Sequence, residues 1–252
     1  MSPHSRILLL ASLAALVAGG CATSPPYAGD VHAGDSELAS RARDEYGTLT
    51  ESLFREDQAL LGNEELKTIL GSPVVLPDRA KLAVVRFGRL PYWWGWSEEF
   101  VRMNEAIDAN FLGRLRTSGR LRDVAYLPSL VTPLQMTIPH IRQAGGRLQA
   151  DLVLIYRTST YNYERHRWFK APRTKAYCTV EAVLLNTRTG VIPFSTVVNE
   201  RFAASESKKD YGFNETIARA EQQAIGRAWE RLAQESVAFL DKPQDGATAA
   251  GQ

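Results

Sequence analysis

The sequence predicts an α/β fold with a single mixed sheet, in which a parallel βαβαβ unit is followed by antiparallel hairpins and the whole sheet is covered by helices. Three observations predict this fold. Short apolar runs of strand type alternate with segments of helical period from residue 81 to residue 163. Two further strand-type segments flank the turn residues of 186–190. A long helical pattern then extends over 214–240.

Residues 1–20 have the composition of an export signal. Arg6 and the free amino terminus precede the twelve apolar residues Ile7 to Ala18, which are too few to span a bilayer, and two glycines lead to Cys21. This arrangement resembles the lipobox of bacterial lipoprotein signal peptides. The resemblance implies that Cys21 is acylated, palmitate included, and becomes the first residue of the mature chain. Cleavage without lipidation, which would release a soluble protein, is the alternative.

The residue that follows the cysteine carries a further implication of this resemblance. In lipoproteins of double-membraned bacteria, a residue other than Asp at that position implies transfer to the outer membrane, and this chain has Ala22. We therefore expect a lipid anchor in the outer membrane, with the protein on the periplasmic side.

The mature chain is predicted to contain one main domain with additions at both ends. Residues 21–34 are small, polar and rich in Gly and Pro, which predicts a flexible tether. Residues 35–78 should form N-terminal helices, and the second of these is expected over 63–71. The α/β domain then occupies 79–241, and the polar tail 242–252 is predicted to be disordered.

The elements of the α/β domain follow from their residue patterns. Pro139 should interrupt the second helix of this domain, and the pair Gly145 and Gly146 should end it. Because helical crossovers join the first three strands, these strands should be parallel. In chain order the predicted segments are strand 81–87, helix 98–118, strand 124–127, helix 133–143, strand 151–163, strands 175–187 and 191–203, and helix 214–240.

Four of these segments resemble a known family. They are the strand KLAVVRF at 81–87, the strand ADLVLIY at 150–156, the hairpin VEAVLLNTRTGVIPFSTVV at 180–198 and the helix ETIARAEQQAIGRAWERLAQE at 215–235. Together they resemble the periplasmic α/β domain of the curli-export lipoproteins. Similar domains occur in the activator lipoproteins of penicillin-binding proteins and at the N terminus of TolB. The resemblance implies an adaptor, an activator or a ring-forming component of an envelope assembly.

Sequence motifs for catalysis are missing. The chain has no phosphate-binding loop, no Gly-x-Ser-x-Gly, no His-Glu-x-x-His and no Cys-x-x-Cys. No two histidines stand at metal-ligand spacing, so we expect no metal site, no cofactor and no catalytic residue. The sequence therefore predicts a protein that is not an enzyme, with a hydrolase assembled from distant Glu and His residues as the least favoured alternative.

The two cysteines are not expected to pair. Acylation of Cys21 would leave Cys178 without a partner for a disulfide. Cys178 shares one face of a predicted strand with Val180 and Leu184, which predicts a packed thiol rather than a nucleophile.

Aromatic residues gather in two predicted loops. Four of the five tryptophans lie there, and the second loop, residues 164–175, holds five Lys and Arg against Glu164 alone, a local charge of +4. If strands 81–87 and 151–163 are parallel, both loops leave the same edge of the sheet and could form one patch. The rings either bind a ligand or only cover the end of the core. The candidate interaction residues are Trp93, Trp94, Trp96, Arg165, Arg167, Trp168, Phe169 and Lys170.

Overall charge favours no particular partner. Without Arg6, the mature chain has 29 of the 30 Lys and Arg residues against 28 Asp and Glu. Export makes nucleic acid an improbable partner, although rings beside positive charge would suit it. We therefore expect a lipid-anchored periplasmic protein that binds an envelope protein and is not an enzyme. It could form a homo-oligomer. A module that binds peptidoglycan or another glycan through the Trp-rich edge is the alternative.

Overall fold

The computed structural model describes Leu53 and residues 62–71, 75–88, 98–134, 136–167 and 170–243, with the side chains of Arg167 and Lys170 excepted. These residues belong to one compact unit, Arg43–Gln252, whereas a second unit, Met1–Ala42, lies outside the described residues. The predicted signal peptide, the tether, the first N-terminal helix apart from Leu53, and residues 244–252 also lie outside them.

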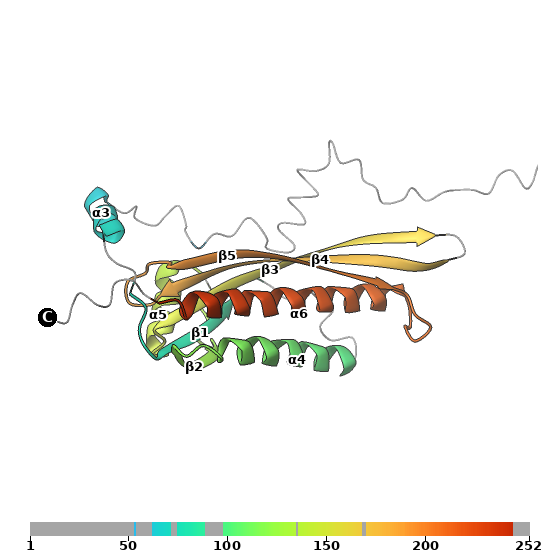
Figure 1. Ribbon diagram of the computed structural model, residues 1–252, viewed down its shortest axis with the longest axis horizontal. Coiled ribbons are helices and arrows are strands. Elements are labelled where there is room, and N and C mark those ends of the chain that lie inside the picture. The colour runs from blue at the N-terminus through green and yellow to red at the C-terminus, as the bar shows by residue number, and fades with distance from the viewer. Residues whose placement is uncertain are drawn as a thin grey trace, which may run out of the picture. The chain divides into compact units, whose positions relative to one another are not determined.

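The described elements follow the predicted order (Figure 1). The second N-terminal helix is present as α3, and its residues are all exposed. Among the described residues, no helix combines the length and the apolarity that crossing a membrane requires. The elements are α3 (Asn63–Gly71), β1 (Ala80–Arg86), α4 (Glu98–Leu115), β2 (Leu121–Tyr126), α5 (Ile138–Arg147), β3 (Leu152–Arg167), β4 (Lys170–Asn186), β5 (Phe194–Ser205) and α6 (Phe213–Leu240).

The strands form one five-stranded mixed sheet with the order β2-β1-β3-β4-β5. β1 is parallel to both β2 and β3, while β3 with β4 and β4 with β5 are antiparallel. The predicted fold, a parallel βαβαβ unit followed by antiparallel hairpins, is confirmed. The turn between β4 and β5 also forms as predicted. The side-chain oxygen of Asn186 accepts the N–H groups of Arg188 and Thr189, and Gly190 takes a positive φ of 76°.

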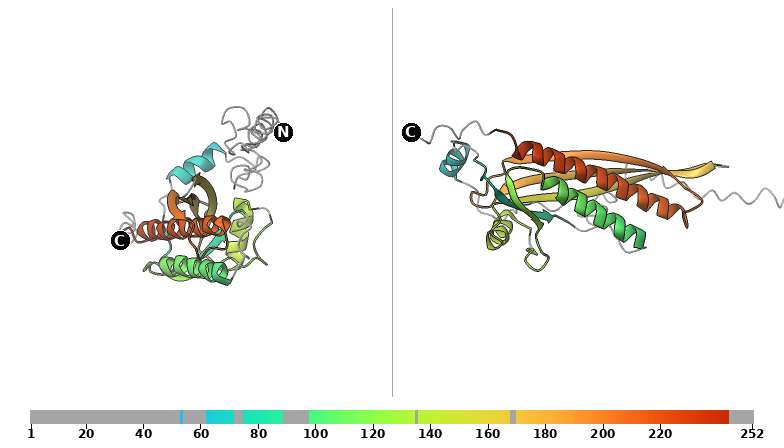
Figure 2. Two further views of the ribbon diagram at one scale, coloured as in Figure 1. Left: turned by 90° about the vertical axis from the view of Figure 1, so that its right-hand side faces the viewer. Right: turned by 60° about the horizontal axis from the view of Figure 1, so that its bottom comes forward.

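Apolar side chains form a separate core on each face of the sheet. Figure 2 shows α4 and α6 side by side along the sheet. The larger core lies under α4 and α6, where Trp229 and Phe111 pack on strand residues such as Leu154. The smaller core lies under α5, where Ile141 packs with Val153 and Ile155. Because neighbouring residues of β3 alternate between the two cores, this strand is apolar on both sides at its beginning.

The second crossover helix differs from its prediction. α5 begins at Ile138, so Pro139 lies in the first turn, where its missing N–H needs no helical partner. The helix also continues through Gly145 to Arg147. A Cβ at Gly145 would lie 2.9 Å from the Cγ2 of Val153, which means that this glycine permits a close approach of α5 to β3. The expected interruption at Pro139 and the expected end at the glycine pair were therefore wrong.

The long hairpin also differs from its prediction. β3 runs to Arg167 and β4 starts at Lys170. Most of the segment 164–175, which was expected to be a loop, is therefore part of the antiparallel ladder between β3 and β4. These residues are polar and lack the apolar alternation of a half-buried strand. Backbone hydrogen bonds between the two strands extend the strands through these residues. Such pairing leaves no mark in the pattern of apolar and polar residues.

Candidate interaction surface

β3 and β4 extend well past the parallel part of the sheet. β1 pairs with β3 only as far as the pair Arg86 and Tyr156, whereas β3 continues for eleven residues to Arg167. Of the strands that the structure describes, only β3, β4 and β5 form this distal part of the sheet, and its tip reaches beyond α6 in Figure 1. A surface on these three strands is therefore separated from the apolar centre of the domain.

α6 covers one face of the distal sheet by apolar packing and by hydrogen bonds. The indole N–H of Trp229 donates to the Thr158 hydroxyl at 3.0 Å, and further out the Asn162 amide donates to the Glu221 carboxylate. Thr158 and Asn162, the two residues of β3 in these bonds, are both even-numbered. Since side chains of a strand alternate, the odd-numbered residues of β3 point to the opposite face.

The opposite face carries three exposed tyrosines. Tyr161, Tyr163 and Tyr177 expose 68%, 56% and 39% of their surface, although aromatic side chains usually bury theirs. Tyr161 and Tyr177 are paired directly across β3 and β4, and Tyr163 lies two residues along from Tyr161 on the same strand face. The three rings therefore form one cluster rather than isolated exposures.

Four exposed cations surround the tyrosines. In the ladder, Tyr177 is paired with Arg201, Tyr163 with Lys175, and Arg165 with Arg173. Within the described part of the chain, no carboxylate forms an ion pair with any of these four cations. We refer to the surface formed by these side chains as the basic tyrosine face. It consists of Tyr161, Tyr163, Arg165, Arg173, Lys175, Tyr177 and Arg201.

The face has a neutral, hydrogen-bonded boundary toward the centre of the sheet. Arg157 forms an ion pair with the directly opposite Glu181, and the next row contains a 2.7 Å hydrogen bond from the Thr179 hydroxyl to Asn199. The positive charge is consequently concentrated at the outer three rows, while the whole chain carries a formal charge of only +2. Like charges held this close repel one another, and an anionic partner would relieve that repulsion.

The predicted interaction residues fall into three groups. Arg165 belongs to the basic tyrosine face and is exposed. Arg167 and Lys170 are paired in the backbone ladder beside the tip. The remaining predicted residues and the predicted lipid site lie outside the described residues: Cys21, Trp93, Trp94, Trp96, Trp168 and Phe169. The parallel pairing of β1 and β3, from which a joint aromatic patch was expected, is confirmed.

Sequence reasoning missed the tyrosines and Arg201. The alternation of Tyr161 and Tyr163 was available as a signal, because both rings fall on one face of any strand through them. Tyr177 and Arg201 joined them only once the register between β3, β4 and β5 was known.

A second polar cluster lies at the carboxyl ends of the parallel strands, where α/β sheets commonly bind ligands. The Tyr126 hydroxyl donates to Asp108 at 2.6 Å, and the guanidinium of Arg86 lies 5.7 Å from the ring centre of Trp229. Burial raises the pKa of Tyr126, with Tyr156 and Asp108 adding to the effect. Burial likewise raises the pKa of Tyr156 to about 12. Both phenols stay protonated at neutral pH, so neither is available there as a general base.

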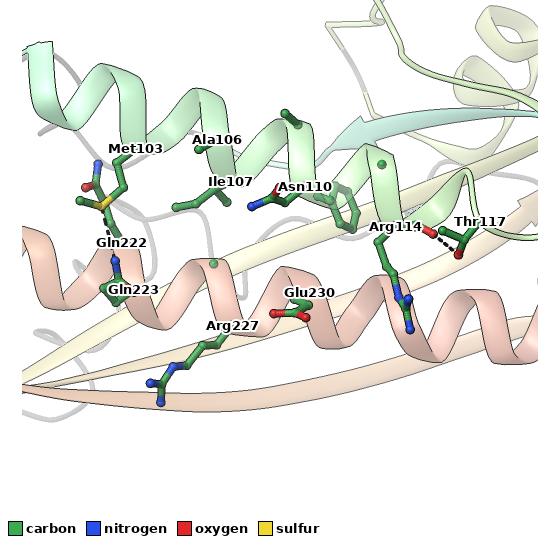
Figure 3. Close-up of a pocket in the computed structure, with 14 residues that line it drawn as sticks. Met103, Ala106, Ile107, Asn110, Arg114, Thr117, Gln222, Gln223, Arg227 and Glu230 are labelled. Atoms are coloured by element: carbon green, nitrogen blue, oxygen red, sulfur yellow. Dashed lines mark hydrogen bonds between the residues drawn. The ribbon is translucent and has the colours of Figure 1, made fainter.

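A groove of about 640 Å³ runs between α4 and α6 (Figure 3). Among the described residues that line it, Glu230 is the one carboxylate and none is a histidine. Among the described residues, no group of three or more His, Cys, Asp or Glu side chains could hold a metal ion. The described lining of the groove therefore does not contain the paired acid and base groups that a hydrolytic site needs.

The Cys178 thiol is buried, as predicted from its strand face. Burial raises its pKa to about 12, and the carboxylates of Glu221 and Glu200 add to that effect. A thiol held in its protonated form is a poor nucleophile.

The geometry defines an α/β domain with one long hairpin that carries the exposed basic tyrosine face. No family model matches the chain, and no curated protein matches it. Solved structures with a related fold include a hypothetical protein from Chlamydia trachomatis, with 14% identity over 64% of this chain and 98% of that chain and a TM-score of 0.39. They also include a minor lipoprotein from Acinetobacter baumannii, with 9% identity over 64% of this chain and 94% of that chain and a TM-score of 0.34.

The C-terminal domain of LpoB from Salmonella enterica is also similar, with 14% identity over 53% of this chain and 90% of that domain and a TM-score of 0.24. The solved structures that this chain resembles thus include bacterial lipoproteins. The expected likeness to the curli-export and TolB domains stays a prediction.

Proposed function

We propose that this chain is a lipid-anchored, non-enzymatic protein of the cell envelope that binds an acidic protein partner through the basic tyrosine face. The observation that carries the proposal is the set of four cations and three tyrosines exposed together on one side of β3, β4 and β5. Tyrosine and arginine are the residue types that contribute most to binding at protein interfaces. The role would be that of an adaptor or an assembly component.

Charge argues for the acidic character of the partner. A partner surface with Asp and Glu residues would neutralise Arg165, Arg173, Lys175 and Arg201 while contacting the rings between them. Such binding should weaken as salt is added, because exposed charges are screened within about 10 Å at 0.1 M ionic strength.

The anchor is tested separately from the binding face. Cys21→Ser should move the full-length protein from the membrane to the soluble fraction and abolish incorporation of labelled palmitate. Cys178→Ala is the matched control, because it removes the other cysteine and should leave the fractionation unchanged. A Cys21→Ser protein that remains in the membrane fraction would refute the lipid anchor. Sucrose-gradient separation of the two membranes tests the proposed outer-membrane location.

Site-specific photo-crosslinking in intact cells tests the binding face. A photoreactive residue at Tyr161 or Tyr163 is expected to yield an adduct, whereas one at Arg102, which is exposed on α4, is not. The crosslinked peptide, identified by mass spectrometry, should be rich in Asp and Glu. The triple charge reversal Arg173→Glu, Lys175→Glu and Arg201→Glu should remove the adduct without lowering the thermal midpoint by more than a few degrees.

Two results would contradict the proposal. Adducts of equal yield at Tyr161 and Arg102 would show that the face has no special role. Co-sedimentation with purified peptidoglycan that the triple reversal abolishes, with no protein adduct, would favour the glycan-binding alternative.

A further inference from the structure

β5 forms one edge of the sheet, and its backbone shows which groups are unpaired there. The N–H of Glu206 donates to the carbonyl of Pro172, which makes this a hydrogen-bonded pair of the antiparallel ladder between β4 and β5. Such pairs recur at every second residue, and the ladder from Arg173 to Leu184 has no register shift. The even-numbered residues of β5 therefore bond to β4. The odd-numbered ones direct their N–H and C=O groups away from the sheet: Ser195, Val197, Asn199, Arg201, Ala203 and Ser205.

This edge has few of the features by which proteins usually protect an edge strand. Within the described residues, no strand pairs with the outer side of β5, and all six of its odd-numbered residues are exposed. β5 is twelve residues long and contains no proline, no lysine and no bulge, and Arg201 is the one charged residue among the six outward ones. The opposite edge, β2, is better protected, because it has only six residues and exposes two charged ones, Arg122 and Asp123.

The edge and the basic tyrosine face adjoin each other. The odd-numbered side chains of β5 point to the same side of the sheet as Tyr161 and Tyr177, and Arg201 belongs to both surfaces. A strand added next to β5 would lie about 4.8 Å away and would direct every second side chain to that side. Acidic side chains at those positions would lie beside Arg201 and within reach of the long Lys175 and Arg173 side chains.

We infer that the partner contributes an extended segment, acidic at alternate positions, that adds to β5 as a sixth strand of the sheet. This inference rests on the proposed function and names the form in which the acidic partner binds. Backbone hydrogen bonds to the six outward residues supply affinity, and the basic tyrosine face selects the acidic side chains. A second copy of this chain fits less well, because pairing two β5 strands would join two basic faces into one sheet surface.

The test uses the full chain and a synthetic decapeptide of alternating Thr and Glu. Amide hydrogen exchange should slow at least tenfold at Val197, Asn199 and Arg201 when the peptide is saturating, while Val198 and Glu200 change little. A peptide of the same composition with its five Glu residues in one block, and an alternating Thr and Lys peptide, should each bind at least tenfold more weakly.

A pair of variants separates strand addition from contact with the face. Asn199→Pro removes one outward N–H and no bond to β4, and should weaken binding of the alternating peptide at least tenfold. Asn199→Ala keeps that N–H and should change the affinity less than twofold.

Each other outcome overturns the inference in a recognisable way. If the alternating peptide binds with unchanged exchange at the odd amides, the face binds without strand addition and the proposed function stands. The same holds if this peptide does not bind at millimolar concentration while the charge-dependent crosslink persists. If neither the peptide binding nor the charge-dependent crosslink is observed, the proposed function is refuted as well. If hydrogen exchange at the odd-numbered amides of β5 is slow without peptide, and slows further as the protein concentration rises, a second copy of this chain is the occupant.

Discussion

Trp229 donates its indole N–H to the hydroxyl of Thr158 at 3.0 Å, and this bond joins the centre of α6 to the first residues of the distal sheet. The Trp229 ring also contacts Tyr156 and Phe111, with ring centres 5.2 and 5.5 Å apart. Thr158 is two residues past the last pairing of β3 with β1. This contact is therefore one of those that hold the basic tyrosine face in place relative to the rest of the domain.

Removing either partner should loosen this connection. Trp229→Ala removes a fully buried ring and should lower the free energy of unfolding by about 3 to 5 kcal/mol. Thr158→Val keeps the volume but leaves the indole N–H without its acceptor, at a cost of about 1 to 3 kcal/mol. Urea denaturation followed by tryptophan fluorescence and circular dichroism measures both. A Thr158→Val protein as stable as the original would show that the hydrogen bond contributes nothing net.

Asp210 should make the start of α6 sensitive to acid. Burial would raise the pKa of Asp210, but hydrogen bonds from the Ser207 N–H, the Thr216 hydroxyl and the Arg219 guanidinium outweigh it and lower this pKa from 3.8 to about 2. Because the pKa is lower in the folded state, the stabilisation is complete above about pH 4 and is lost as the pH falls toward 2.

The matched variant is Asp210→Asn. At pH 7 it should lower the free energy of unfolding by on the order of 1 to 2 kcal/mol. The difference from the original protein should shrink between pH 4 and pH 2 and vanish below that range. Urea titrations at a series of pH values give the comparison. A difference that persists unchanged at pH 2 would assign the effect to packing instead of charge.

Cys178 should be chemically inert in the folded protein. Its pKa of about 12 leaves almost no thiolate at pH 8, and its side chain is buried. An aromatic disulfide reagent should therefore label Cys178 of the Cys21→Ser protein at least a hundredfold more slowly under native conditions than in denaturant. Rapid native labelling would mean that the sheet opens around β4.

Gln149 should accept glycine without loss of stability. It has a positive φ of 54° between α5 and β3, a conformation that favours glycine over residues with a Cβ. We expect Gln149→Gly to be between unchanged and about 1 kcal/mol more stable, since strain relief opposes the greater freedom of the unfolded chain. In contrast, Gln223→Gly, at an exposed position within α6, should destabilise by about 1 kcal/mol. Thermal unfolding of both variants compares them directly.

Asp151, two residues after Gln149, has a clear structural role. Its carboxylate accepts the N–H of Lys81 at 3.0 Å and lies 3.5 Å from the guanidinium of Arg122, so it joins the start of β3 to β1 and β2.

Much of the fold could be predicted because local patterns and connection rules act within short stretches of chain. The apolar runs around Val84 and Leu154, the turn ending at Gly190 and the helical period around Trp229 each indicated their element. Pro139 misled the prediction because a proline is disruptive inside a helix but acceptable in its first turn. Whether a helix starts one residue before Pro139 depends on packing under α5, which a local pattern does not contain.

Part of the candidate site was also within reach. The charge of the 164–175 segment, with Arg165, Arg173 and Lys175, was visible in the sequence. The contribution of Tyr177 and Arg201 was not, because they are 24 residues apart in the chain and are joined only by the pairing of β4 with β5.

The sequence by itself determined the order of the elements and the parallel and antiparallel parts of the sheet, because periodicity and connection geometry permit few alternatives. Only the tertiary structure decided which face of the distal sheet is free. α6 packs on the even-numbered side chains of β3, where Trp229 donates a hydrogen bond to Thr158 and contacts apolar residues. The tyrosines and cations on the odd-numbered side therefore stay exposed. That choice depends on burying the largest apolar surface over the whole domain, which is a property of the packed chain and not of any segment within it.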